Sequence, residues 1–129
     1  MPVSYEKNTA KHYIHCYMLE KGTLDEVLEY VDEIADDPDL DDPFFEIVDF
    51  SKVDNLDFGY YQSDYLMSKY TELGKNKGYL GTIFISGGEY GQALANMFAT
   101  TGDFKGLDLR IVQSLEEAEL LIENYFKDS

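Results

Sequence analysis

The sequence has little that would cross-link the chain or place it in a membrane. Cys16 is the only cysteine among 129 residues, which excludes an internal disulfide and fits a reducing compartment. The longest apolar stretches, such as residues 79–85, are far too short to span a bilayer. The first residues lack the basic and apolar regions of a secretory signal. We therefore expect a cytoplasmic protein without a transmembrane segment.

Basic residues are also scarce. Ten Lys and Arg stand against 26 Asp and Glu, which gives a net charge of −16. Between Thr23 and Asp64, fifteen acidic residues are accompanied by a single base, Lys52. Nucleic acids and anionic lipids are bound mainly through Lys and Arg, so we expect no nucleic-acid partner. The acidic stretch indicates either a surface for a protein partner with a basic surface or a solvated face that favours solubility.

Metal-binding patterns are few. His12 and His15 are the only histidines, and they stand three apart on a predicted strand, so their side chains face opposite sides of a sheet. Residues 37–41 look like the start of a calcium loop, but the positions that need Gly and Glu hold Asp42 and Val48. We therefore predict no metal site and no cofactor.

Asp49 ends a predicted strand and resembles the phospho-accepting aspartate of response-regulator receivers. That chemistry also needs an acidic pair to hold magnesium, a hydroxyl after the fourth strand and a lysine after the fifth. Ser86 could supply the hydroxyl, but Gln113 and Ser114 stand where the lysine should be. We interpret Asp49 as a structural residue that caps the following loop.

Residues 86–91 follow a predicted strand and open a helix, where a dinucleotide-binding fingerprint would stand. Ser86 replaces the first of its three glycines, and Glu89 would bring a carboxylate close to a bound phosphate. We therefore interpret Gly87 and Gly88 as a tight turn. The start of the helix could still hold a small anion.

Apolar periodicity predicts one α/β domain over residues 1–129. Strands are expected at residues 3–7, 13–18, 44–50, 79–85 and 107–112. Helices are expected to begin at Thr23, Asp57, Gly88 and Ser114, and the second to end at Gly74. The order ββαβαβαβα predicts a mixed, largely parallel five-stranded sheet flanked by four helices, with a hairpin at its start.

Aromatic residues are abundant, with eleven Tyr and eight Phe. Tyr60, Tyr61, Tyr65 and Tyr70 all fall on the second predicted helix. Core packing would account for most of these rings. A surplus around one helix can instead line a pocket or an interface, where Tyr offers contact area at little cost in entropy.

Four local strings, taken with the order of elements, resemble the SpoIIAA-like proteins of the STAS superfamily. They are EKGTL at 20–24, IVDFSKV at 47–53, YGQALANMF at 90–98 and SLEEA at 114–118. The resemblance implies a STAS-like fold, which is compared with the CRAL-TRIO lipid carriers, and a role in binding. In anti-sigma-factor antagonists of this superfamily a serine at the start of the second helix is phosphorylated. Phe58 and Gly59 occupy the corresponding positions, so the resemblance does not carry over that switch.

The leading functional hypothesis is a non-catalytic binding module in protein–protein regulation. Its expected site residues are Asp57, Tyr60, Tyr61, Tyr65, Ser86, Gly87, Gly88 and Tyr90. One alternative is a carrier of a small apolar ligand or lipid, which needs a wide cavity. Another is an enzyme with a dispersed site formed by Asp49, Asp57, Ser86 and Tyr90, which needs converging polar groups with shifted pKa values. The sequence leaves open whether the chain forms a homodimer.

Overall fold

The computed structural model describes residues 3–18, 21–53, 55–57 and 59–127, and for residues 21, 22, 55–57 and 60 it describes only the backbone. The strands are β1 (Val3–Asn8), β2 (Tyr13–Met18), β3 (Lys21–Thr23), β4 (Phe44–Asp49), β5 (Asn55–Asp57), β6 (Tyr79–Ile85) and β7 (Leu109–Val112). The α-helices are α1 (Leu24–Asp36), α2 (Tyr60–Asn76), α3 (Glu89–Asp103) and α4 (Leu115–Lys127). Two short 3₁₀ helices, η1 (Thr9–Lys11) and η2 (Pro38–Asp41), complete the order.

The main sheet confirms the predicted architecture. Its five strands lie in the order β1-β2-β4-β6-β7. β1 and β2 pair antiparallel as the predicted hairpin, and every other neighbouring pair is parallel. The strands alternate with four helices, so the mixed, largely parallel sheet expected from the sequence is present.

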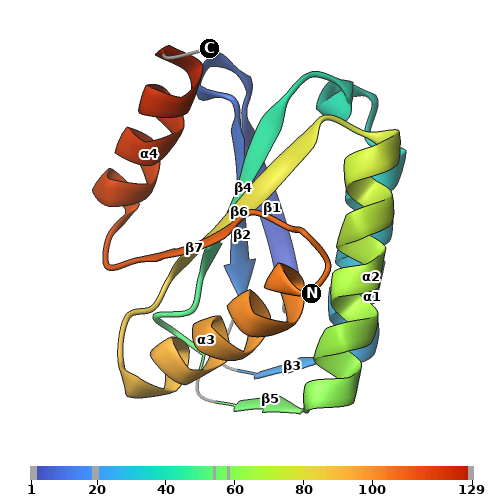
Figure 1. Ribbon diagram of the computed structural model, residues 1–129, viewed down its shortest axis with the longest axis vertical. Coiled ribbons are helices and arrows are strands. Elements are labelled where there is room, and N and C mark those ends of the chain that lie inside the picture. The colour runs from blue at the N-terminus through green and yellow to red at the C-terminus, as the bar shows by residue number, and fades with distance from the viewer. Residues whose placement is uncertain (1–2, 19–20, 54, 58, 128–129) are drawn as a thin grey trace.

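A second, two-stranded parallel sheet was not predicted. β3 pairs with β5, and Thr23 stands opposite Asp57. Each of these strands has three residues, too few to show a periodic pattern in the sequence. The pairing draws the segment before α1 beside the segment before α2 (Figure 1).

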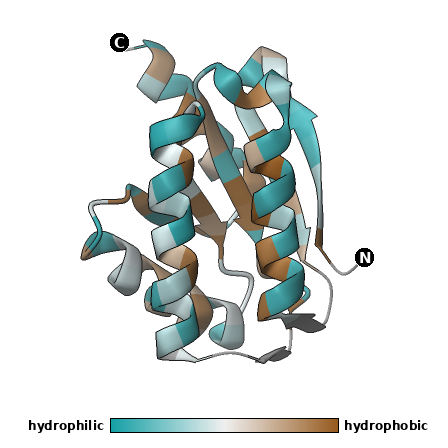
Figure 2. Ribbon diagram, turned by 90° about the vertical axis from the view of Figure 1, so that its right-hand side faces the viewer, coloured by the Kyte–Doolittle hydropathy of each residue, from teal (hydrophilic) through white to brown (hydrophobic). Residues whose placement is uncertain are grey.

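Three helices cover one face of the main sheet and α4 covers the other (Figure 1). Strands β2, β4, β6 and β7 are added in one direction, so right-handed crossovers place α1, α2 and α3 on the same face. Figure 2 shows α1 and α2 side by side in front of the sheet, with hydrophilic and hydrophobic residues alternating along both. We call the core between the sheet and these three helices the inner layer.

The helix boundaries confirm two predicted caps and correct a third. The hydroxyl of Thr23 accepts a hydrogen bond from the Glu26 amide at 3.3 Å, and Ser114 accepts one from the Glu117 amide at 3.2 Å. Asp57 was expected to begin α2, but it lies in β5, and the helix begins after Gly59. Strand pairing therefore holds the Asp57 backbone in an extended conformation, which moves the helix start.

The C-terminal end of α2 also differs from the sequence prediction. Gly74 was expected to end the helix, which instead continues to Asn76. The Lys77 amide still bonds to the Leu73 carbonyl at 2.9 Å, and the Gly78 amide bonds to the Leu40 carbonyl at 3.0 Å. A Cβ at position 78 would lie 2.0 Å from the carbonyl oxygen of Asp42. The close approach of the chain after η2 therefore requires glycine at position 78. Gly74 meets no such contact and stays inside the helix.

Candidate functional site

Two of the predicted site residues lie exposed on the first turns of α2. Tyr61 is 85% exposed and Tyr65 is 50% exposed. They are four residues apart and therefore share one side of the helix. The ammonium of Lys69 lies 5.8 Å from the centroid of the Tyr65 ring. Tyr70 lies on the opposite side and is buried in the inner layer. One helix thus carries aromatic rings both outward and inward.

The turn after α3 brings a further exposed ring to the same region. Lys105 forms an ion pair with Asp64 of α2 at 3.2 Å, and the neighbouring Phe104 is 80% exposed. One turn earlier, the buried hydroxyls of Ser63 and Thr101 lie 2.9 Å apart. We call Tyr61, Tyr65 and Phe104, around the Asp64–Lys105 pair, the aromatic surface. Sequence reasoning missed Phe104, although a large apolar residue just past the helical stripe of α3 was an available signal.

The Ser86–Gly88 turn lies where β6 ends and is built as a close crossing. Gly87 has φ of +69°, and a Cβ there would lie 2.4 Å from the Cα of Ser51 in the loop after β4. Ser86 is buried, and its hydroxyl donates to the side-chain oxygen of Gln113 at 3.1 Å. The turn therefore joins the ends of three neighbouring strands, as the tight-turn interpretation expects. It borders an open depression of about 450 Å³ that is lined by Ser86, Gly88, Glu89, Gln92, Ala93, Asn96 and Gln113.

The structure does not gather the predicted residues into one site. The start of α2 lies at the lower right of Figure 1 and the start of α3 at the lower left, with Tyr90 on the latter. The side chains of Asp57 and Tyr60 lie outside the described residues. Tyr61 and Tyr65 therefore belong to one surface, and Ser86, Gly87 and Gly88 to another.

Asp49 has the structural contact expected of it. Its Oδ1 accepts a hydrogen bond from the Ser51 amide at 2.8 Å, which closes the turn after β4. His12 lies between η1 and β2 and stacks on Phe126 at 4.2 Å, while His15 stacks on Tyr17. Among the described residues no three His, Cys, Asp or Glu are placed to hold a metal ion. None of the described helices has the length and apolar character needed to span a bilayer.

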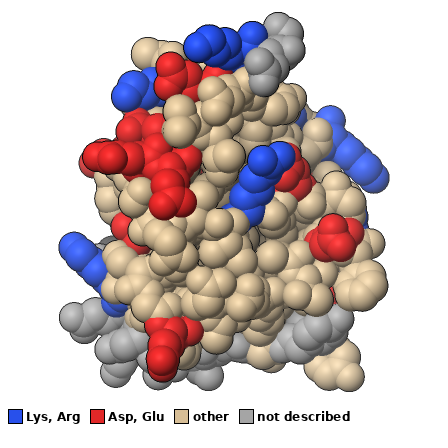
Figure 3. Space-filling model, turned by 60° about the vertical axis from the view of Figure 1, so that its left-hand side comes forward, with Lys and Arg blue, Asp and Glu red and all other residues tan. Residues whose placement is uncertain are grey.

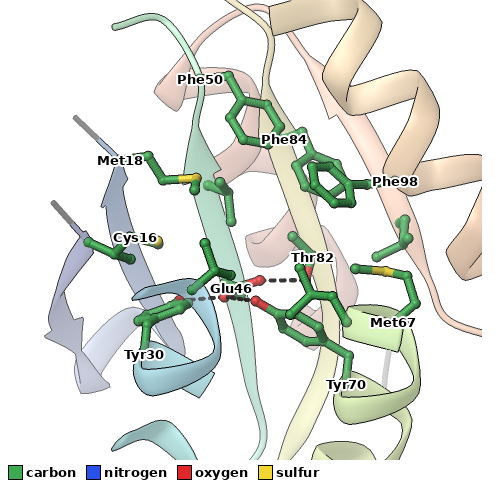
Figure 4. Close-up of a pocket in the computed structure, with 15 residues that line it drawn as sticks. Cys16, Met18, Tyr30, Glu46, Phe50, Met67, Tyr70, Thr82, Phe84 and Phe98 are labelled. Carbon is green, nitrogen blue, oxygen red and sulfur yellow. Dashed lines mark hydrogen bonds between the residues drawn. The ribbon is translucent and has the colours of Figure 1, made fainter. Parts of the chain in front are cut away.

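A buried polar cluster, which the sequence did not predict, lies in the inner layer (Figure 4). Glu46 of β4 is 1% exposed. Its Oε2 accepts hydrogen bonds from the hydroxyls of Tyr30 and, at 2.7 Å, of Tyr70. Its Oε1 accepts one from Thr82 at 2.8 Å, and the Thr82 hydroxyl also lies 2.6 Å from that of Tyr79. We call these five residues the Glu46 cluster.

Burial dominates the electrostatics of this cluster. It raises the pKa of the Glu46 carboxyl, and the hydrogen bonds from Tyr30, Tyr70 and Thr82 oppose that rise because they favour the charged form. Burial also raises the pKa of Tyr30, Tyr70 and Tyr79 well above the ordinary phenol value. The described residues form no ion pair with Glu46. The cluster thus holds one acid in an apolar environment without a neutralising cation.

The space beside the cluster is small. A cavity of about 30 Å³ is lined by Glu46 and Thr82 and by apolar side chains that include Met18, Met67 and three Phe. Those rings, Phe50, Phe84 and Phe98, lie with centroids 5.4 to 5.9 Å apart and nearly parallel planes. A cavity of this size is on the scale of one water molecule, whose share of liquid volume is about 30 Å³. The inner layer is therefore filled in this conformation, and its polar groups are enclosed.

Acidic side chains line the outer side of α1. Asp25, Glu29, Asp32 and Asp36 follow helical spacing and are exposed, and the described residues give none of them an ion pair. Asp32 also lines a groove with Lys69 and Glu72 of α2. On the side that carries α4, acidic groups form separate clusters, with uncharged surface and several basic side chains among them (Figure 3). The acidic stripe of α1 thus lies beside the helix that carries Tyr65.

Comparison of the chain with models of known protein families, with curated proteins and with solved structures finds no significant match. The resemblance to SpoIIAA-like proteins of the STAS superfamily therefore stays a prediction.

Proposed function

We propose that this protein is a non-catalytic binding module that docks a protein partner through the aromatic surface. The observation that carries the proposal is the exposure of Tyr61 and Tyr65 on one side of α2, and of Phe104 beside Lys105, which pairs with Asp64 of α2. Aromatic residues concentrate in the centres of protein interfaces, where they supply most of the contact energy. The expected location is the cytoplasm.

The aromatic surface rests on a well-held scaffold. α2 is joined to α3 by the Ser63–Thr101 contact and to the turn after α3 by the Asp64–Lys105 ion pair. It is joined to the sheet by the Tyr70–Glu46 hydrogen bond. Binding therefore requires little ordering of the backbone, which lowers the entropic cost of association. This arrangement favours a preformed docking surface on α2.

The charge beside this surface indicates a basic partner. One residue of the acidic stripe, Asp32, lines the groove between α1 and α2 together with Lys69 and Glu72. The described residues leave the four carboxylates of the stripe without ion pairs. Carboxylates placed this way attract a partner that carries Lys and Arg and speed its encounter. The rings of α2 and the turn after α3 would then supply the contact area. The partner is accordingly expected to present basic residues around an apolar centre.

Site-specific photo-crosslinking tests this function. A photo-reactive phenylalanine analogue replaces Phe104 in one variant and Leu120, an exposed apolar residue of α4, in a matched control. After irradiation in cells, the Phe104 position should yield one defined cross-linked protein that the Leu120 position does not. Cross-linking at neither position, or the same products at both, would contradict the proposal.

A further inference from the structure

The carboxyl group of Glu46 connects both outer helices to the sheet. Tyr30 reaches it from α1, Tyr70 from α2 and Thr82 from the neighbouring strand β6. Figure 4 shows the two tyrosine hydroxyls meeting the carboxyl from either side. Loss of this one group would remove hydrogen bonds from two helices at once. Glu46 is therefore placed to determine how firmly α1 and α2 stay on the sheet.

Protonation changes what this carboxyl can do. As a carboxylate it accepts from three hydroxyl donors, but it keeps a full charge inside an apolar layer. As a neutral acid it carries no charge, and one oxygen becomes a donor. Among the side chains that the structure describes, none that lines the adjoining cavity is cationic. The charged form therefore gains more from contact with water than the neutral form does.

Among the titratable groups of the cluster, Glu46 is the first to lose its proton as the pH rises. Cys16 faces it from β2, Tyr30 from α1, Tyr70 from α2 and Tyr79, through Thr82, from β6. Burial raises the pKa of the Cys16 thiol and of all three phenols well above their ordinary values. These groups stay neutral over the range in which a carboxyl loses its proton.

We propose that Glu46 is a proton-operated latch: when protonated it holds α1 and α2 on the sheet, and when ionised it favours a form in which the helices lift and water reaches the cluster. The surroundings suit such movement, because Met18 and Met67 beside the cavity are unbranched and adapt to new packing. The latch acts on α2, which also carries Tyr61 and Tyr65, but its test requires no partner.

Cys16 provides a built-in reporter of the open form. It is buried, lines the same cavity and is the only thiol of the chain. Its reaction rate with an aromatic disulfide reagent is measured between pH 5 and pH 8.5, without any partner, for the wild type and Glu46→Gln. The ratio of the two rates cancels the pH dependence of the thiol. It should rise with pH in a one-proton step, by at most about tenfold for each pH unit.

A second variant assigns the step to Glu46. Tyr70→Phe removes a hydrogen bond that favours the ionised carboxyl, so the midpoint of the step should move to higher pH. If Glu46→Gln does not fold, the thiol reaction rate of the unfolded chain replaces that of the variant as the reference for this shift. A merely structural role for Tyr70 would change the rate and leave the midpoint in place. A rate ratio that is constant across the pH range, or an unmoved midpoint, would overturn the latch.

Discussion

Tyr70 donates a hydrogen bond to Glu46 at 2.7 Å in the core, while Tyr65, five residues earlier on the same helix, is half exposed. α2 therefore connects a buried acid with an outward-facing aromatic surface. The two sides can be substituted separately, because Tyr61 and Tyr65 are exposed whereas Tyr70 is buried against Glu46.

The first prediction concerns the pH dependence of stability. Burial raises the folded-state pKa of Glu46 above its unfolded value. Between these two pKa values the folded state binds more protons, so the contribution of Glu46 to the free energy of unfolding is largest below the unfolded pKa. It falls as pH rises through the folded pKa, by about 1.4 kcal/mol for each unit between them.

Urea unfolding of the wild type and Glu46→Gln across pH 4 to 8 measures this contribution, since the other carboxylates cancel in the difference. The wild type should lose stability relative to the variant as pH rises. A difference that does not change with pH would show that Glu46 has the same pKa in both states.

The second prediction concerns Gly87, whose backbone packs closely against the loop after β4. Gly87→Ala places a Cβ 2.4 Å from the Cα of Ser51 and also forces an alanine into a positive φ. Gly106→Ala is the matched control, because Gly106 has φ of +77° with no atom within 4 Å of the added Cβ. The control should cost about 1 kcal/mol for the backbone alone. Gly87→Ala should lower the free energy of unfolding clearly more, and equal losses would contradict the close crossing.

The third prediction concerns salt. The exposed carboxylates of α1 and of the segment that follows it repel one another, and few cations lie near them. Sodium chloride screens this repulsion, so the Tm at pH 7 should rise with ionic strength. Thermal unfolding at increasing sodium chloride concentration measures the effect. A Tm that stays flat or falls would show that the acidic groups are already compensated.

The sequence predicted the main sheet because its strands carry clear local signals. β4 and β6 are rich in apolar and β-branched residues, and Thr23 and Ser114 stand at helix starts with a glutamate three residues on. The predicted start of α2 was wrong because the sequences of β3 and β5 show no periodic pattern. Only the pairing of the two strands reveals them.

The Glu46 cluster could not be predicted from local sequence patterns. An acidic residue in the interior of the apolar strand Phe44–Asp49, between Phe45 and Ile47, was a visible signal of something unusual. Its hydrogen-bond partners lie 16, 24 and 36 residues away, so only the fold brings them together. Similarly, the ion pair between Asp64 of α2 and Lys105 in the turn after α3 connects Phe104 with the aromatic surface. Tyr61 and Tyr65 could be placed together from the sequence because they share one helix.

The proposed function is the binding of a protein partner through the aromatic surface. Its most direct test is the Kd of the purified cross-linked partner for the wild type, for Tyr61→Ala, Tyr65→Ala together, and for Leu120→Ala as a control. One hot-spot ring contributes about 2 kcal/mol, so the double variant should bind at least about thirtyfold more weakly with little change in Tm. Leu120→Ala should bind like the wild type. A folded double variant with wild-type affinity would contradict the proposal. The Ser86–Gly88 turn would then be the next candidate for the binding site.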